Sequence, residues 1–128
     1  MTNEEKNALG AEILDSCIEV HKFLGPGLLE SVYANSLKKE LELRKINAKS
    51  GVSIPLEYKG FKTEKGFQLD ILVEDEIIIE VKSVDIMLPV FKAQLMTYLK
   101  LTGKSLGYLI NFNETLLKDG FKRIVSNF

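Results

Sequence analysis

The chain has 128 residues, 45% of them hydrophobic, and a formal net charge of −1 at pH 7, which together predict one folded domain over residues 1–128. Its single cysteine, Cys17, excludes a disulfide framework, a cysteine-ligated iron–sulfur cluster and the paired-cysteine zinc patterns. The sequence has neither a charged-then-apolar leader nor an apolar run near ~20 residues, so we expect a cytoplasmic protein without a membrane segment.

The first half of the chain predicts two helices and one strand. Apolar residues at helical spacing indicate a helix over residues 4–24, which the turn Gly25-Pro26-Gly27 ends, and helical periodicity resumes over 28–45. Apolar residues then alternate with small or polar ones from Val52 to Tyr58, which predicts a strand. Pro55 within it favours an edge position or a bulge, because proline donates no ladder hydrogen bond.

The second half predicts a hairpin, a helix and a further strand. The hairpin joins residues 66–73 and 77–84, and Pro89 opens a helix that runs to about Leu101. Residues 106–112 follow as a buried strand, and the tail predicts a short helix around Leu116-Leu117 and then a strand from Phe121 to Val125. No repeat or linker is visible, so the pattern indicates a single α/β domain.

The hairpin brings three charged residues together. Side chains at i and i+2 of a strand share a face, so Glu80 and Lys82 lie side by side. A loop of odd length centred on Asp75 sets Asp70 directly across from Glu80. A slip of one residue would place Asp70 opposite Ile79, so the apolar pattern favours the odd register. In that register the opposite face is continuous and apolar, formed by Leu69, Ile71, Val73, Ile77, Ile79 and Val81.

A fourth charged residue, Glu30, falls on the apolar stripe of the second predicted helix. Turning the helix at 100° per residue places Glu30 between Leu37 and Leu41, which predicts that it points at the core. A buried carboxylate needs a cation, a metal or strong donors, and Asp70, Glu80 and Lys82 would provide that setting. The alternative is a partly hydrated carboxylate in the first helical turn, stabilised by the helix dipole.

Three more polar residues have two interpretations each. His21 faces inward on the first predicted helix, where it either makes a satisfied core hydrogen bond or orients Glu30 or an attacking water. Gln94 and Tyr98 share a face of the third predicted helix, either as ordinary amphipathic packing or as residues that support a metal-bound water or a phosphate. No second histidine exists, so a histidine-based zinc site is not expected.

Carboxylates without cysteine or histidine partners form an oxygen-rich site, which suits Mg²⁺ with Mn²⁺ as a substitute. Such a metal polarises a phosphoryl oxygen, while Lys82 positions or activates the nucleophile and offsets transition-state charge. The chemistry indicated is phosphodiester hydrolysis. The alternative is that the Glu80-Val81-Lys82 strand is only a solvated charged face.

The positively charged residues fall into three runs. Near-neutral net charge argues against a chain whose whole surface binds nucleic acid, so each run is either a solvated face or a local contact. The runs are Lys38, Lys39, Arg44, Lys45 and Lys49, then Lys59, Lys62 and Lys65, and finally Lys118, Lys122 and Arg123.

A family resemblance spans nearly the whole chain. The run from Leu24 to Tyr33, with Gly27, Glu30 and Tyr33, and the later Asp70, Glu80-Val81-Lys82 and Gln94 to Tyr98, resembles the GxxExxY proteins of the PD-(D/E)xK nuclease superfamily. The resemblance implies a restriction-endonuclease-like three-layer core. Its central mixed sheet of about four strands is flanked by helices in the order α-α-β-β-β-α-β. Leu69 replaces the proline that names the superfamily.

The resemblance also implies roles for individual residues. Asp70 and Glu80 are metal ligands, the main-chain carbonyl of Val81 is a further ligand, and Lys82 is the catalytic lysine. Glu30 is the helix carboxylate near the metal, and it counts among the catalytic residues with Asp70, Glu80 and Lys82. The residues expected to support them are His21, Tyr33, Gln94 and Tyr98, the last two forming the QxxxY signature of the recombination-nuclease branch.

These observations predict a Mg²⁺-dependent nuclease that hydrolyses nucleic acid, with DNA favoured over RNA. A partner protein is expected to supply specificity, and both a monomer and a homodimer agree with the sequence. Two alternatives remain at this point. One is a catalytically silent nucleic-acid-binding or assembly module that retains the fold. The other is a structural or dimerisation domain in which Lys82 forms salt bridges with Glu80 and Asp70.

Overall fold

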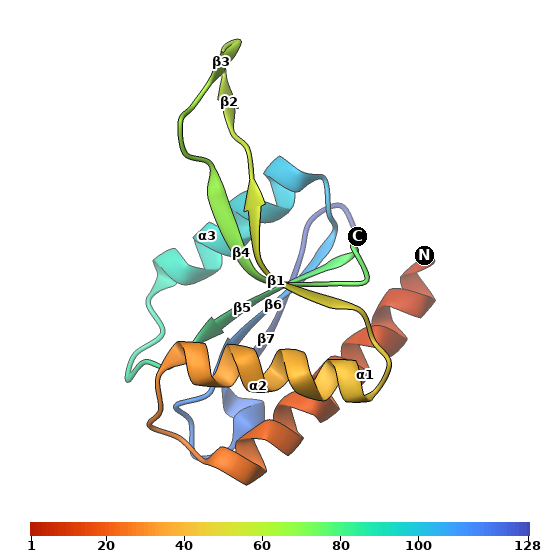
Figure 1. The fold of residues 1–128 in the computed structure, drawn as a ribbon, viewed down its shortest axis with the longest axis vertical. Coiled ribbons are helices and arrows are strands. Elements are labelled where there is room, and N and C mark those ends of the chain that lie inside the picture. The colour runs from red at the N-terminus through yellow and green to blue at the C-terminus, as the bar shows by residue number, and fades with distance from the viewer.

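A mixed five-stranded sheet with helices on both faces organises the computed structural model, which describes residues 1–128 (Figure 1). Its strand order is β1-β4-β5-β6-β7, and only the β5–β6 pair is parallel. The α/β, restriction-endonuclease-like architecture is thus confirmed, with five strands in the main sheet. In chain order the elements are α1 (Asn3–Leu24), α2 (Glu30–Leu43), β1 (Ala48–Ile54), β2 (Glu57–Tyr58), β3 (Phe61–Lys62), β4 (Phe67–Val73), β5 (Ile77–Lys82), α3 (Pro89–Thr102), β6 (Leu106–Asn111), η1 (Leu117–Gly120) and β7 (Phe121–Val125).

Two apolar clusters lie on opposite faces of the sheet. Helices α1 and α2 lie together on one face, where Leu37 and Ile71 belong to the larger cluster (Figure 1). Helix α3 covers the other face, where Leu95 packs in the same cluster as Ile78. Because a parallel pair needs a crossover connection, α3 links β5 to β6 over that face. None of the helices has the length and apolar character needed to cross a membrane.

Local signals explain where the helices begin and end. Helix α1 begins at a capping box in which the Thr2 hydroxyl accepts from the Glu5 amide and the Glu5 carboxylate accepts from the Thr2 amide. Pro89 stands in the first turn of α3, where its missing N–H is harmless. Gly103 ends α3 in the left-handed region at φ 73°, which glycine adopts without steric cost.

The structure confirms the hairpin register and revises the first strand. Val73 pairs with Ile77 and Ile71 with Ile79, so the connection is centred on Asp75 as predicted. The first strand is β1 at 48–54, whereas the alternation predicted residues 52–58. It is an edge strand, as Pro55 indicated, and it ends just before that proline. Residues 57–62 instead form a separate hairpin, β2–β3, which projects beyond the sheet and the helices (Figure 1).

Tyr33 fixes the turn between α1 and α2. Its buried ring stacks on Phe112 with a centroid separation of 4.6 Å. Its hydroxyl donates to the Gly25 carbonyl and accepts from the Leu28 amide at 3.1 Å. The tyrosine of the Gly27-Glu30-Tyr33 motif therefore holds the segment that leads into Glu30.

Replacing Tyr33 by phenylalanine is expected to destabilise the protein by about 1–3 kcal/mol, because the Gly25 carbonyl and the Leu28 amide lose their partner. Urea denaturation followed by circular dichroism would measure the change. Tyr58→Phe is the matched control, since the Tyr58 side chain is exposed and its hydroxyl makes no hydrogen bond in the protein. Equal midpoints for Tyr33→Phe and the parent would contradict this role.

Candidate metal and phosphodiester site

Asp70 and Glu80 meet where β4 separates from β5. Ladder pairing between the two strands ends at Ile71 and Ile79, one residue short of the carboxylates. Beyond that point the Val81 amide donates a 2.8 Å hydrogen bond to Asp70 Oδ2. The Asp70 carboxylate thus points at β5 and takes the place of a backbone acceptor, which fixes its orientation beside Glu80.

Strand β4 changes face at Asp70, where its pairing with β1 is interrupted, and we call this point the kink. Gly51, beside Asp70 in the β1–β4 register, adopts φ +59°, a left-handed conformation that side chains disfavour. On one side of the kink Ile71 belongs to the α1–α2 cluster, and on the other Leu69 belongs to the α3 cluster. The prediction that Leu69 shares a face with Ile71 was therefore wrong, because strict alternation assumes a strand without a kink.

Glu80 is a buried carboxyl with an unsatisfied oxygen. Its side chain is 4% exposed, and Oε1 has no hydrogen-bond partner. Burial raises the pKa of Glu80 to about 9, and the hydrogen bond with Asp70 and the negative charge of Asp70 add to the rise, against a smaller lowering by Lys82. In the metal-free protein the raised pKa favours the neutral, protonated Glu80 carboxyl at pH 7.

Replacing Glu80 by glutamine is expected to stabilise the metal-free protein at alkaline pH. The pKa of Glu80 is raised in the folded state, so unfolding releases a proton at any pH between the ordinary glutamate value and about 9. The contribution of Glu80 to the free energy of unfolding is therefore fully present at acid pH. It is lost as the pH rises from the ordinary glutamate pKa to about 9. We expect Glu80→Gln to gain on the order of 2–4 kcal/mol relative to the parent by pH 8.

Thermal melts from pH 5 to pH 9 in a metal chelator would measure this effect. Glu64→Gln is the control, because Glu64 is exposed and neutralising it removes one charge without removing a buried one. Parallel curves for Glu80→Gln and the parent across the whole range would show that the Glu80 carboxyl is not protonated in the folded state.

Lys82 lies at the end of β5 without an acidic partner. Its Nζ lies 4.5 Å from the centroid of the Phe91 ring, in a cation–π contact. None of the ion pairs in the structure includes Lys82, so the structure does not contain the Lys82 salt bridges expected of a purely structural domain. The ammonium group is half-buried and available to a ligand.

Asn111 holds the backbone that follows Lys82. It is almost fully buried, and its side chain amide donates to the Val84 carbonyl at 3.0 Å and accepts from the Val84 and Asn113 amides at 3.1 Å. The Lys82 carbonyl accepts from the Phe112 amide at 2.9 Å. The sequence reasoning missed Asn111 and Phe91. The available signal for Asn111 was an amide within the otherwise apolar run of residues 106–112.

Glu30 is exposed, and the prediction that it points at the core was wrong. It is the first residue of α2, and the buried residues of that helix begin at Tyr33, one turn further along the stripe. Its position matches the alternative interpretation, a hydrated carboxylate in the first turn of the helix. Glu30 lines a shallow surface pocket with Ser83 and Val84, the two residues after Lys82, and the Ser83 hydroxyl donates to the Leu28 carbonyl at 2.6 Å.

His21 occupies a structural position. Its Nε2 lies 2.7 Å from the Glu114 carbonyl oxygen, so the ring donates to the segment after β6 and not to Glu30. The ring is buried and lies 6.5 Å from the Phe112 ring, centroid to centroid. This is the satisfied core hydrogen bond that was one of its two interpretations.

Tyr98 approaches the carboxylates from α3, whereas Gln94 is exposed on that helix. Burial raises the pKa of Tyr98, and the negative charges of Glu80 and Asp70 raise it further, which places the hydroxyl in their field. The Tyr98 ring stacks on Phe67 at 4.4 Å. Tyr98 thus connects the carboxylate pair to the first residue of β4.

The carboxylate pair fits a divalent cation. A hard cation would satisfy two neighbouring carboxyls of which one has a buried, unpartnered oxygen, because it supplies the missing partner and offsets the negative charge. The structure contains no group of three or more histidine, cysteine or acidic side chains arranged to hold a metal. Asp70 and Glu80 therefore would need a backbone oxygen, water or substrate phosphate to complete the coordination.

Comparisons with known proteins agree with this geometry. The family model described as the PD-(D/E)XK nuclease superfamily matches residues 7–124, which include both carboxylates, Lys82 and the whole five-stranded sheet except part of its last strand. Neither the search of curated proteins nor the search of solved structures found a match. With nearly the whole chain covered, the protein belongs to the PD-(D/E)XK nuclease superfamily.

Proposed function

We propose that this protein is a divalent-metal-dependent nuclease that hydrolyses phosphodiester bonds in nucleic acid, with DNA as its substrate. One observation carries the proposal. The Glu80 carboxyl is buried, contacts Asp70 and has one oxygen without a hydrogen-bond partner. It lies near Lys82, which forms no ion pair, at the point where β4 separates from β5. A structural domain would gain nothing from such an arrangement, because an unsatisfied buried polar group is costly.

Asp70, Glu80 and the main-chain carbonyl of Val81 would hold the metal, Mg²⁺ or in its place Mn²⁺, with Glu30 contributing from the start of α2. When bound, the metal supplies Lewis-acid polarisation of a phosphoryl oxygen. Lys82 supplies a mobile positive charge that leaves the Phe91 ring to position the nucleophile and to stabilise the charge of the transition state. Asn111 keeps the backbone after Lys82 in place, and Tyr98 borders the carboxylates from α3.

The position of the carboxylates favours a polymer as the substrate. Small-molecule enzymes enclose their substrate in a cavity, whereas none of the pockets of this structure is lined by Asp70, Glu80 or Lys82. The spacing Gly27, Glu30 and Tyr33 supports placing the chain in the GxxExxY group of the superfamily. A partner protein would supply sequence specificity, and the active form would be a monomer or a homodimer. The buried, free Cys17 thiol agrees with a cytoplasmic location.

Incubation of the protein with labelled single-stranded and duplex DNA and RNA, in Mg²⁺ or Mn²⁺ and in a chelator, tests this proposal. We expect the protein to cleave DNA only when the metal is present. This cleavage activity should co-purify with the protein through two chromatographic steps. Metal-independent products, or products that also form with the Asp70→Asn variant at the parent rate, would contradict it. Nucleic-acid binding without cleavage in either metal would favour the silent binding module.

A further inference from the structure

The β2–β3 hairpin forms an arm that projects from the body of the protein (Figure 1). We call residues 57–65 the arm. Tyr58 pairs with Phe61 across its two short strands, so both rings lie on the same face of the hairpin. Their side chains are 63% and 77% exposed, and both lie outside the two apolar clusters. Two adjacent exposed aromatic rings at the end of an arm are open to a planar ligand.

The same arm carries positive charge that the protein leaves unpaired. Its lysines are Lys59, Lys62 and Lys65, and none of them takes part in an ion pair. Lys59 Nζ lies 5.4 Å from the centroid of the Tyr58 ring. The arm also has two acids, Glu57 and Glu64, so its net charge is modest, and Lys59 is the lysine that lies over one of the rings.

The other basic runs differ in this respect. In the run from Lys38 to Lys49, Arg44 pairs with Glu12, Asp15 and Glu40, and Lys38 and Lys49 each pair with one carboxylate. In the run near the C-terminus, Arg123 lies over the Phe128 ring and donates to Asn7. Only the arm combines unpaired lysines with exposed rings on one projecting element.

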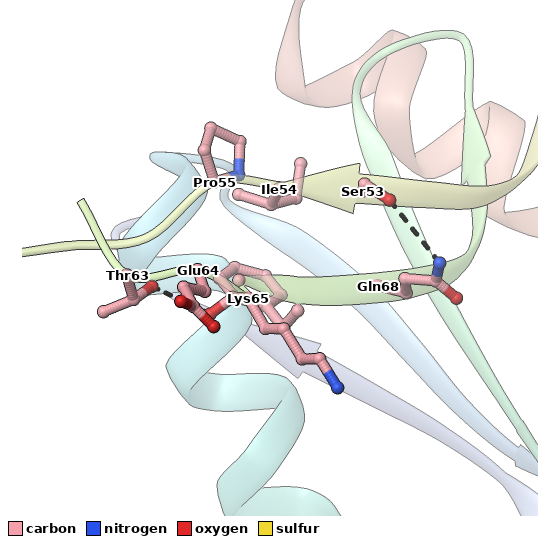
Figure 2. Close-up of a pocket in the computed structure, with 9 residues that line it drawn as sticks. Ser53, Ile54, Pro55, Thr63, Glu64, Lys65 and Gln68 are labelled. Carbon is pink, nitrogen blue, oxygen red and sulfur yellow. Dashed lines mark hydrogen bonds between the residues drawn. The ribbon is translucent and has the colours of Figure 1, made fainter.

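Hydrogen bonds join the two segments of the chain at the base of the arm. The Thr63 hydroxyl donates to the Leu56 carbonyl at 2.9 Å and lies 2.8 Å from the Lys65 carbonyl, and the Thr63 amide also donates to Leu56. A side chain at Gly66 would overlap the Ile54 carbonyl, so the two segments approach closely there. Figure 2 shows the pocket beside this junction, which has a volume of about 520 Å³ and is lined by Thr63 and Lys65 and by Ser53 and Gln68.

The arm leads into β4, the strand that carries Asp70. Chain residues 63–66 lead directly into β4, where Phe67 stacks on Tyr98 and Asp70 lies three residues further on. Tyr98 in turn lies in the electrostatic field of Asp70 and Glu80. A chain of nucleotides that reaches the carboxylates can therefore continue along β4 toward the exposed rings of the arm.

We propose that the arm binds an unpaired segment of the nucleic-acid substrate, with bases stacked on Tyr58 and Phe61 and phosphates near Lys59, Lys62 and Lys65. Exposed aromatic rings beside positive charges are the arrangement that single strands use, because every base offers a stacking face irrespective of sequence. In a duplex the bases are stacked on one another and cannot reach the rings. The inference rests on the proposed function and adds that the substrate has a single-stranded part.

Fluorescence anisotropy with a labelled single-stranded oligonucleotide, in a chelator so that no cleavage occurs, tests the inference. We expect the double variant Tyr58→Ser and Phe61→Ser to bind at least about tenfold more weakly than the parent. Blunt duplex of the same length should bind the parent and the double variant equally. Phe23→Ser is the matched control, because Phe23 is 87% exposed but lies at the end of α1, and it should bind like the parent.

The outcomes separate the arm from the catalytic proposal. Weakened single-strand binding by the double variant supports the inference whether or not the parent cleaves DNA in metal. Equal single-strand affinity of the double variant and the parent overturns it. The inference is also overturned if the parent is a dimer and the double variant is a monomer with the same oligonucleotide affinity. That result would assign the rings to contact between two copies of the chain. Because both side chains are exposed, thermal melts should confirm that the double variant folds.

Discussion

Lys82→Ala is expected to reduce DNA cleavage by about 100-fold or more while Mn²⁺ affinity stays close to that of the parent. The ammonium group of Lys82 is not tied to an acid, so its loss removes charge stabilisation and leaves Asp70 and Glu80 in place. Single-turnover cleavage of an end-labelled oligonucleotide at saturating Mg²⁺ measures the chemical step, and calorimetric titration with Mn²⁺ measures the affinity.

Lys92→Ala is the matched control for this variant. Lys92 is an exposed lysine of α3, adjacent to Phe91 in the chain, and it forms no ion pair. It should cleave at the parent rate, because removing one distant surface charge changes only weak, screened interactions. Equal cleavage by Lys82→Ala and Lys92→Ala would remove Lys82 from the reaction.

Asp70→Asn is expected to weaken Mn²⁺ binding by at least about tenfold and to reduce cleavage in parallel. The asparagine oxygen can still accept the hydrogen bond from the Val81 amide, so the fold of β4 and β5 should survive. What is lost is the negative charge that a divalent cation requires beside Glu80. Calorimetry of the parent and the variant at pH 7, with and without a non-cleavable oligonucleotide, gives the comparison directly.

Asp75→Asn serves as the control for Asp70→Asn. Asp75 lies at the centre of the connection between β4 and β5, and its side chain makes only an exposed ion pair with Lys49, so the substitution should leave metal affinity unchanged. Unchanged Mn²⁺ affinity in Asp70→Asn would show that the metal binds elsewhere. If the parent itself binds no Mn²⁺, even with oligonucleotide present, the chain retains the superfamily's fold without its metal chemistry.

Local sequence patterns identified most of the elements and the pairing at the site. The three helices, the β4–β5 hairpin and the last two strands follow from periodicity and from the glycines and prolines between them. The position of Asp70 beside Glu80 also follows, because a slip of one residue would set Asp70 opposite Ile79. These features depend on short stretches of chain, where spacing determines which side chains share a face.

Other features depend on contacts between distant segments, which spacing does not encode. Glu30 is exposed because the packing of α2 on the sheet begins only at Tyr33, and the orientation of Asp70 depends on its hydrogen bond from the Val81 amide of another strand. The alternation extends the predicted first strand into the arm as far as Tyr58, since two-residue strands are too short to show a period of their own. The unpartnered oxygen of Glu80 is likewise a tertiary property, because burial and the absence of a donor arise only when β4, β5 and α3 surround it.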